Sequence, residues 1–487
     1  MPGGLAPRAL MWILMTCAIV TAIAWLSEIY QPRSLDDGPI QLALLTSRVA
    51  AGLPFYRDFR VAPWLPVTYG PIAPWLASHL VHAFGGGVMG ALAAGRAIMI
   101  GALLIVSILI FGLAKTTGAS TISAAIAALA FIMAPLARLR TDYRVDMLAL
   151  AFNFTGLMLF ELDFELLAVL PFAAAFFTKQ NQLYGIAAVF LMLCATHRFR
   201  RATMVGAAWL AIVGGGLAAL QLAFPWFWLN TFGALAPTLD VAAPFSFLAH
   251  QIPRHLAILA LAVYALWRWP WNLAAWLFIV ALGENFVSCF RWGSGPYYFL
   301  PTIAAAAILS AKSLDAIFER IESMSPSRAA QAAIAIIAAL IFCSGSLFVA
   351  INGNWKLDFA LMPVQYASRT GVGKSTVNEL RAISGPIVVT DTNYLIRDQR
   401  PNVEWMEALI LSGMKAHGAF DDRAMLDSIR RREIAAFVLG PSGLDRDYRG
   451  RLVFWPELRE AIRDNYRPLP GGGDVLVMVP KARPVTP

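Results

Sequence analysis

The sequence predicts a polytopic α-helical membrane protein with a small soluble α/β domain at its C-terminal end. Of the 487 residues, 58% are hydrophobic and only 14% are charged, whereas a soluble protein averages about 25% charged residues. Apolar runs of about 17–25 residues, the length that crosses a bilayer, recur along the chain. A soluble protein with as many buried helices would need far more polar surface than this chain supplies.

About eleven segments are apolar enough to be expected as membrane spans. The first begins after Arg8 and resembles a signal peptide, but it is long for one and no small-x-small cleavage site follows it, so we expect an uncleaved span. The fifth and sixth expected spans, 164–178 and 182–196, are short and are separated by the polar segment 178–182. The expected spans are 9–29, 91–113, 119–137, 145–161, 164–178, 182–196, 203–224, 253–269, 271–290, 296–312 and 329–351.

The Lys and Arg residues of the loops do not decide the orientation, because both sides carry similar numbers of them. The two clearest basic segments, 197–201 and 312–328, fall on the inner side if Met1 does. Eleven spans then place the first loop (30–90) and the C-terminal region outside. We therefore expect a transmembrane module at 1–352 and an extracytoplasmic α/β domain at 353–487. The outer loops then carry more cations than the positive-inside rule predicts, and a phosphate-bearing substrate on that side would explain them.

Residues 353–487 show alternating strand and helix patterns, which is typical of an α/β domain. Strands are expected at 385–391, 434–439 and 475–479, and helices at 421–432 and 456–466. Pro456 suits the first position of the second helix. The segment 368–375 is similar to a phosphate-binding loop, but Ser368 stands where the motif requires glycine, so we expect no nucleotide site.

Charge and cysteine patterns exclude other classes. The net charge of +9 is spread along the loops without a long basic run, so nucleic-acid binding is not expected. The four cysteines lie in apolar segments without paired spacing, which excludes a disulfide framework or a cysteine metal cluster. His79 and His82 have helical i, i+3 spacing, but no third ligand is evident, so no metal site is predicted and a divalent metal stays an open alternative.

The first loop carries the strongest candidates for catalysis. Asp36 and Asp37 directly follow the first span and precede a helix expected at 40–51 and a Pro- and aromatic-rich run. A carboxylate held by neighbouring cations can accept a proton from an attacking hydroxyl. The alternative is that Asp37 only caps the helix.

Further polar clusters are expected at the outer ends of the spans. Asp146 opens the fourth span, where it is either a reserve base or a partner of the helix dipole. A buried Lys179 is costly unless paired, and a phosphate would pair it, while arginine binds phosphate through its planar fork. Arg57 and Asp58 are expected to form an ion pair that fixes the loop. The candidate substrate-binding residues are Arg57, Tyr69, Arg144, Lys179, Gln180, Arg291 and Tyr298, with Glu284 and Asn285 beside Arg291.

At these residues the chain resembles the GT-C superfamily of membrane glycosyltransferases, and more narrowly the bacterial lipid A aminoarabinose transferases and protein O-mannosyltransferases of the glycosyltransferase family 39 type. The resemblance covers most of the chain, and only the first loop is rich in motifs. The features that carry it are the pair Asp36-Asp37, then Arg48-x-x-x-Gly52-x-Pro-x-Tyr56-Arg-Asp-Phe59, Tyr69-Gly-Pro71, Arg144-x-Asp146, Lys179-Gln180, Tyr297-Tyr-Phe-Leu-Pro301 and the α/β tail.

The resemblance implies an enzyme of a bacterial inner (plasma) membrane that takes a sugar from a polyprenyl-phosphate donor on the outer face. The first acid of the family's pair is its main catalytic carboxylate, which implies this role for Asp36. Asp37 departs from the family, which usually has Glu there. Two other classes are alternatives: a transporter or flippase, which predicts internal repeats and charges within spans, and a non-catalytic scaffold, which leaves the acids of the first loop without a role.

Overall fold

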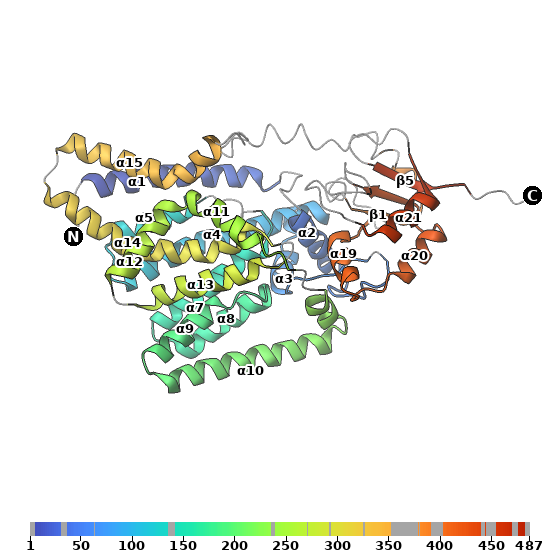
Figure 1. Ribbon diagram of the computed structural model, residues 1–487, viewed down its shortest axis with the longest axis horizontal. Coiled ribbons are helices and arrows are strands. Elements are labelled where there is room, and N and C mark those ends of the chain that lie inside the picture. Colours follow the sequence, from blue (N-terminus) through green and yellow to red (C-terminus); the bar gives the residue numbers. More distant parts are fainter. Residues whose placement is uncertain are drawn as a thin grey trace, which may run out of the picture.

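The computed structural model consists of a helix bundle and an α/β unit beyond one end of it (Figure 1). The short helices of the first loop lie between the two, and the N-terminus lies at the opposite end of the bundle (Figure 1). The structure describes residues 5–30, 37–62, 64–134, 142–234, 239–269, 271–291, 294–324, 327–351, 378, 380–390, 403–439, 444, 454–469 and 476–482.

Each of the eleven expected spans corresponds to a helix. The helices are α1 (Leu5–Glu28), α4 (Gly87–Thr116), α5 (Thr121–Met133), α7 (Val145–Glu161), α8 (Glu165–Thr178), α9 (Tyr184–Ala195), α10 (Phe199–Ala223), α12 (Leu256–Arg268), α13 (Leu273–Cys289), α14 (Leu300–Ser323) and α15 (Arg328–Ile351). The fold class predicted from the sequence, a polytopic α-helical membrane protein, is confirmed.

The helices differ in length and in burial. Within the described residues, four are long and apolar enough to cross a membrane alone, or five if α11 (Ala243–Arg254) and α12, which are bent by 95° at their junction, form one span. The shorter apolar helices pack against longer ones, α7 against α4 and α13 against α14. Four consecutive alanines of α14, Ala304–Ala307, are fully buried, and such small residues let membrane helices approach closely.

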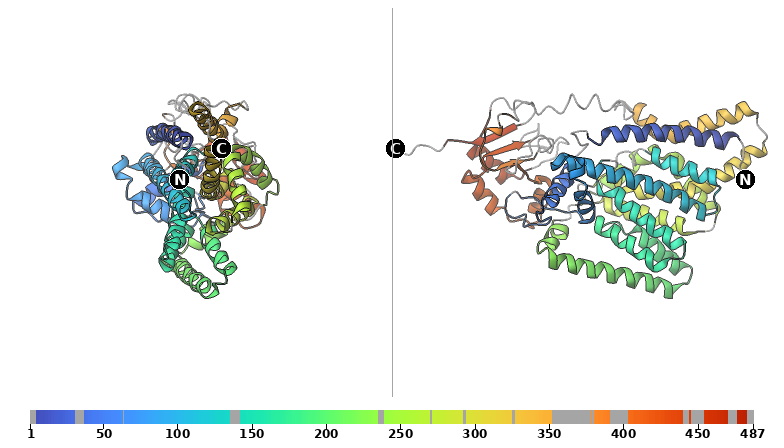
Figure 2. Two further views of the ribbon diagram at one scale, coloured as in Figure 1. Left: turned by 90° about the vertical axis from the view of Figure 1, so that its left-hand side faces the viewer. Right: turned by 180° about the vertical axis from the view of Figure 1, so that it is seen from behind.

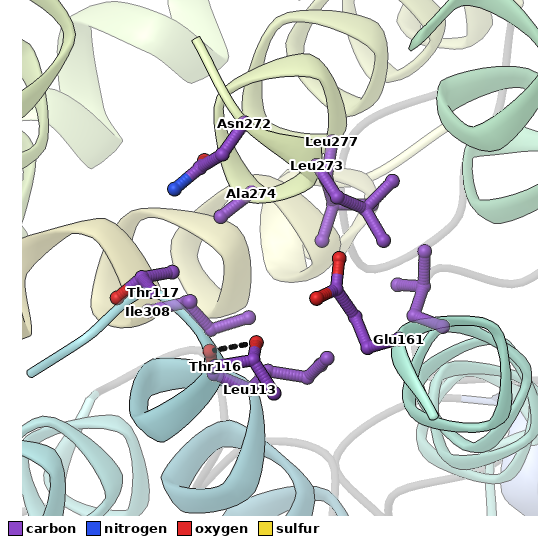
Figure 3. A pocket seen from close by; sticks show the side chains of 10 residues that line it. Leu113, Thr116, Thr117, Glu161, Asn272, Leu273, Ala274, Leu277 and Ile308 are labelled. Carbon is purple, nitrogen blue, oxygen red and sulfur yellow. Dashed lines mark hydrogen bonds between the residues drawn. The ribbon is translucent and has the colours of Figure 1, made fainter. Parts of the chain in front are cut away.

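A small cavity lies between the C-terminal ends of α4 and α7, the N-terminal end of α13 and an inner part of α14. It has a volume of about 40 Å³, which is room for about one water molecule. The Glu161 side chain points toward it, opposite Asn272 and Leu273 (Figure 3). Asn272 caps α13, because its Oδ1 accepts a hydrogen bond from the Ala275 N–H at 3.1 Å, so the cavity belongs to helix packing at that end.

The first loop folds into α2 (Asp37–Ala50), α3 (Ile72–Ser78) and η1 (His82–Phe84), joined by an irregular segment. α2 corresponds to the helix expected at 40–51 and packs against α3 and α4. Buried polar contacts tie these pieces together: Gln41 Nε2 donates to the Pro66 carbonyl at 3.4 Å, and the hydroxyls of Thr46 and Tyr143 lie 2.6 Å apart. We call the end of the bundle that carries these helices the α2–α3 end.

The C-terminal region forms a five-stranded sheet in the order β2-β1-β3-β5-β4. β1 (Ile387–Val389) is parallel to β2 (Val403–Trp405) and β3 (Ala436–Leu439), and β5 (Leu476–Pro480) is antiparallel to β3 and to β4 (Tyr466–Pro468). Three of the strands and the helices α20 (Arg423–Arg430) and α21 (Pro456–Asn465) lie where the sequence predicts them. The prediction missed β2, β4 and α19 (Ala408–Ala416). The predicted domain boundary at 352/353 and the segment 368–375 lie outside the described residues.

Two aromatic residues of the first loop belong to the hydrophobic core of the α/β unit. Phe59 and Trp64 are almost fully buried, together with Met406, Phe420 and Trp455, and the rings of Phe59 and Phe420 lie 6.4 Å apart. Trp64 has φ = 60°, a backbone conformation that is unfavourable for a bulky side chain and persists where the surroundings hold it in place. The first loop and the α/β unit therefore pack at the same end of the bundle, as Figure 2 also shows.

We expect Trp64→Ala to loosen the α/β unit from the first loop. Truncation of a buried Trp typically costs about 3–5 kcal/mol of stability, and alanine, which also carries a Cβ, does not remove the strain of the positive φ. The detergent-purified variant should melt at a lower temperature, and a protease should release the α/β unit sooner. Trp75→Ala is the matched control, because Trp75 is 56% exposed in the same loop. Equal protease resistance of the two variants would contradict this account of the packing.

Candidate functional site

The Tyr69-Gly70-Pro71 segment of the first loop lies against the end of α8. A Cβ atom on Gly70 would overlap the carbonyl oxygen of Phe177, so only glycine lets the two backbones come this close. One residue earlier, the Thr68 carbonyl accepts a hydrogen bond from Gln180 Nε2 at 3.4 Å. The loop is thereby placed next to Lys179, the first residue after α8.

Lys179 forms a buried ion pair with Asp146, which lies in the first turn of α7. The Nζ and Oδ1 atoms are 2.6 Å apart, and the two side chains are only 11% and 7% exposed. Burial lowers the pKa of the Lys179 ammonium, but the Asp146 carboxylate and the nearby tyrosines outweigh it and hold that pKa above its ordinary value. The ion pair therefore favours the charged form of Lys179 at the α2–α3 end.

A pair of tyrosines covers this cation. The rings of Tyr297 and Tyr298 stack with their centroids 5.0 Å apart, and Lys179 Nζ lies 4.1 Å from the Tyr298 ring and 5.2 Å from the Tyr297 ring. Arg144 Cζ lies 4.7 Å from the Tyr297 ring. The faces of aromatic rings attract cations, so these tyrosines hold two cations near each other without neutralising them.

α13 supports the loop that carries Lys179. Glu284 Oε1 accepts a hydrogen bond from the Leu183 N–H at 3.2 Å, and Asn285 Nδ2 donates to Thr302 Oγ1 at 2.9 Å. Glu284 thus holds the start of α9 by its backbone. Glu284 belongs to a polar cluster in the sequence but was not predicted as a site residue; its signal is a carboxyl group inside an apolar segment.

Arg96 links the end of the first span to the start of α7. Its side chain is buried, with Nε 2.8 Å from Asp142 Oδ1 and Nη1 donating to the Ile29 carbonyl at 3.3 Å. Asp142 is four residues before Asp146. Arg96 was not predicted from the sequence, although an arginine within an apolar helix is a general signal of a polar site.

The structure brings together five of the residues predicted from the sequence. Arg144, Asp146, Lys179, Gln180 and Tyr298 meet at the α2–α3 end, and Arg291, at the end of α13, is close enough to Tyr298 to act on it electrostatically. The Tyr69 carbonyl accepts a hydrogen bond from the hydroxyl of Tyr56 at 2.9 Å. Burial raises the pKa of Tyr56, so this hydroxyl stays protonated and remains a donor.

The predicted ion pair between Arg57 and Asp58 is wrong. Asp58 pairs with Arg60, whose Nε and Nη2 donate to its two carboxylate oxygens at 2.9 Å each. Asp58 Oδ1 also accepts a hydrogen bond from the Arg60 backbone N–H at 3.0 Å. The chain therefore turns after Asp58 and brings Arg60 back to this carboxylate, a local contact that is common for Asp in turns. The backbone carbonyl of Arg57 accepts a hydrogen bond from Asn230 Nδ2 at 2.8 Å.

The proposed catalytic pair lies at the edge of what the structure describes. Asp36 is outside the described residues, and Asp37 is the first residue of α2, without a described side chain. In the described part of the chain, no group of three or more His, Cys, Asp or Glu residues could hold a metal ion. The role of Asp36 as base and that of Asp37 as helix cap or second acid stay predictions.

Comparison with known proteins identifies the fold. Neither protein-family models nor curated proteins match the sequence. Among solved structures, ArnT from Cupriavidus metallidurans bound to undecaprenyl phosphate superimposes with a TM-score of 0.64 and 14% identity, over 97% of this chain and 98% of that one. Its apo form gives a TM-score of 0.63 at 14% identity, over 96% and 97%. The archaeal oligosaccharyltransferase AglB from Archaeoglobus fulgidus, in complex with an inhibitory peptide and a dolichol-phosphate, gives 0.50 at 10% identity, over 98% and 75%.

These neighbours are membrane glycosyltransferases of the GT-C superfamily, which is the superfamily that the sequence motifs resemble. The chain therefore has the GT-C fold, and the likeness to ArnT extends over both the helix bundle and the C-terminal region.

We expect Gly70→Ala to destabilise the protein by about 1–3 kcal/mol, the usual cost of forcing extra volume into a packed site. The added methyl group has to displace the backbone of Phe177. Thermal unfolding of the detergent-purified variant measures the loss. Gly101→Ala is the control, because a Cβ there meets no atom within 4 Å. If the two variants melt at the same temperature, the loop does not approach α8 as described.

Proposed function

We propose that this protein is a membrane glycosyltransferase that moves a sugar from a polyprenyl-phosphate donor to a glycan, lipid or protein acceptor of the cell envelope. The observation that carries the proposal is the ammonium of Lys179, buried in an ion pair with Asp146 at the α2–α3 end of a chain with the GT-C fold. A buried ammonium next to Arg144 suits a phosphate that is held and then released with its charge. One structural neighbour is bound to undecaprenyl phosphate, which supports the choice of donor.

The reaction proposed is a single displacement at the anomeric carbon of the donor sugar. Asp36 accepts the proton of the acceptor hydroxyl as its oxygen forms the new bond to that carbon. The bond between the anomeric carbon and the phosphate oxygen breaks, and its electron pair leaves with the polyprenyl phosphate. Because attack comes from the opposite side, the configuration inverts. Lys179, Arg144 and Arg291 stabilise the negative charge that develops on the phosphate.

Asp146 acts in this scheme as a positioning residue. Its Oδ1 is 2.6 Å from the Lys179 ammonium, and a carboxylate so close to a cation is a weak proton acceptor. Without a donor, the ion pair satisfies both buried charges. When the phosphate binds, it shares the ammonium with Asp146, which keeps Lys179 from rotating away.

The proposed site lies on the extracytoplasmic face of a bacterial inner membrane. Support for the shared face comes from the packing of Phe59 and Trp64 in the α/β unit, because side-chain contacts cannot reach across a hydrocarbon core about 30 Å thick. Reporter fusions within the exposed turn at Gly418 and in the first loop should both give outside signals.

The proposed function is tested by sugar release. The purified protein is incubated with a panel of polyprenyl-phosphate sugars and a detergent extract of cell envelopes, and the free polyprenyl phosphate is quantified. At least one donor should be consumed faster with the envelope extract than without it. If no donor in the panel is consumed above the rate without protein, the glycosyltransferase assignment is wrong.

We expect Lys179→Met to weaken binding of undecaprenyl phosphate by about tenfold or more, because one charge-assisted contact in a buried site contributes about 1.5–3 kcal/mol. Binding to the variant is measured by scintillation proximity with radiolabelled undecaprenyl phosphate. Lys312→Met is the matched control: its Nζ also lies over an aromatic ring, Trp269, at 5.3 Å, but it is in the half of α14 away from the site. Equal binding by both variants would place the phosphate elsewhere.

The base is tested by the rank order of three substitutions. Asp36→Asn cannot accept the proton and should lower the turnover by about 10²–10⁴-fold, the usual contribution of a general base. Asp37→Asn should cost less, and Asp146→Asn should mainly weaken donor binding. Turnover and undecaprenyl phosphate binding are measured at matched thermal stability. Wild-type turnover by Asp36→Asn would move the base to one of the other two acids.

A further inference from the structure

A second polar and aromatic site lies where α10 ends at the α2–α3 end of the bundle. There, Arg60 of the first loop and Trp226, Trp228 and Phe232 of the segment after α10 surround an open concavity of about 580 Å³. Trp228 is 52% exposed. The concavity is separate from the cluster of Lys179, Asp146, Arg144 and the two tyrosines, which we call the Lys179 cluster. None of the proposed catalytic residues lines the concavity.

Aromatic rings form the walls of the concavity. Arg60 Cζ lies 5.2 Å from the Trp226 ring, and the rings of Trp228 and Phe232 are 4.5 Å apart with a tilt of 37°. Tryptophans at the end of a membrane helix usually anchor it in the interface. That ordinary role does not require a hollow shape, nor a guanidinium placed over one of the rings.

Arg60, the charged residue that lines the concavity, belongs to a neutral pair with Asp58, which is not among the lining residues. Arg60 gives two hydrogen bonds to Asp58, so the charge of the guanidinium is compensated. This contact lowers the pKa of Asp58, which keeps the carboxylate an acceptor. The guanidinium retains further N–H donors, and the carboxylate retains further lone pairs. Adjacent donors and acceptors without net charge suit hydroxyl groups, which both donate and accept, better than they suit an anionic lipid headgroup.

Asn230 connects the concavity to the Lys179 cluster. It is fully buried, and its Nδ2 donates to the carbonyls of Arg57 and Trp226 at 2.8 and 2.9 Å. Its Oδ1 accepts from the Val67 N–H at 2.8 Å. The next residue, Thr68, accepts the hydrogen bond from Gln180, the neighbour of Lys179. A short stretch of the first loop therefore borders both sites.

We propose that the concavity is a subsite for an uncharged sugar of the acceptor, an inference that rests on the proposed function. The apolar face of a sugar ring packs on Trp228 and Trp226, and its hydroxyls bond to Arg60, whose charge is compensated by Asp58. The acceptor then extends along the loop toward the Lys179 cluster, where the donor is bound. This assigns the acceptor a glycan part at the α10 end.

The test is direct binding, which requires no turnover. Saturation-transfer NMR is recorded on the full-length protein in nanodiscs with methyl α-mannoside, methyl β-galactoside and methyl N-acetyl-β-glucosaminide at millimolar concentrations. At least one glycoside should bind. Trp228→Ala should raise its dissociation constant by about tenfold, since stacking on an aromatic ring is worth on the order of 1 kcal/mol or more. Trp228→Phe should retain most of the binding, and Arg60→Met should also weaken it.

Trp271→Ala is the matched control, because Trp271 is 53% exposed just before α13 begins, at the far end of the bundle. Dihexanoyl phosphatidylglycerol is the competing probe. If this lipid displaces the glycoside, the concavity is a headgroup site and the proposal is wrong. The same conclusion follows if no glycoside binds and the lipid binds to the wild-type protein but not to Trp228→Ala. Binding of undecaprenyl phosphate to the wild-type protein separates the sugar subsite from the proposed function. If undecaprenyl phosphate binds and no glycoside does, only the subsite is overturned. If undecaprenyl phosphate does not bind either, the result counts against the proposed function.

Discussion

The buried ion pair between Lys179 and Asp146 is the interaction on which the α2–α3 end depends. Leaving either charge buried without the other is costly. The start of α7, which carries Asp146, and the end of α8, which precedes Lys179, therefore have to lie side by side at the same depth. The pair is closed on one side by Tyr297 and Tyr298, and its loop is held by Glu284 through the Leu183 N–H. One electrostatic requirement therefore brings together segments from four parts of the chain and leaves a cation ready for an anionic ligand.

The first loop adapts to this arrangement through backbone contacts. Gly70 lets the loop lie against the end of α8, and Asn230 holds the loop from the other side by the Val67 N–H. Between Phe59 and Trp64, the same segment enters the core of the α/β unit. The α/β unit is thus attached to the part of the bundle where chemistry is proposed. The almost fully buried side chains of Phe59 and Trp64 fix its position relative to the first loop.

Most of the fold could be predicted from the sequence, because a membrane span must satisfy its own backbone and therefore reads as one long apolar run. The strands β2 (Val-Glu-Trp) and β4 (Tyr-Arg-Pro) contain charged residues and form no apolar run, unlike the equally short β1 (Ile-Val-Val), which was predicted. For the site, the cost of a buried lysine predicted that Lys179 has a partner. Asp146, 33 residues away, was placed in a different cluster, because only packing of α7 against α8 brings the two together. The Arg57–Asp58 pair failed since adjacency in sequence was taken for proximity of side chains.

The charges of the two proposed subsites assign them different parts of one reaction. The Lys179 cluster gathers three cations, Lys179, Arg144 and Arg291, around the carboxylate of Asp146, which favours the binding of an anion there. In the concavity, the charge of Arg60 is already compensated by Asp58, so an anion gains little there while hydroxyl groups keep donors and acceptors. A polyprenyl phosphate and an uncharged sugar would therefore sort to opposite ends of the shared loop by electrostatics alone. Such sorting is useful to a transferase, because donor and acceptor can be bound at once without competing for either subsite.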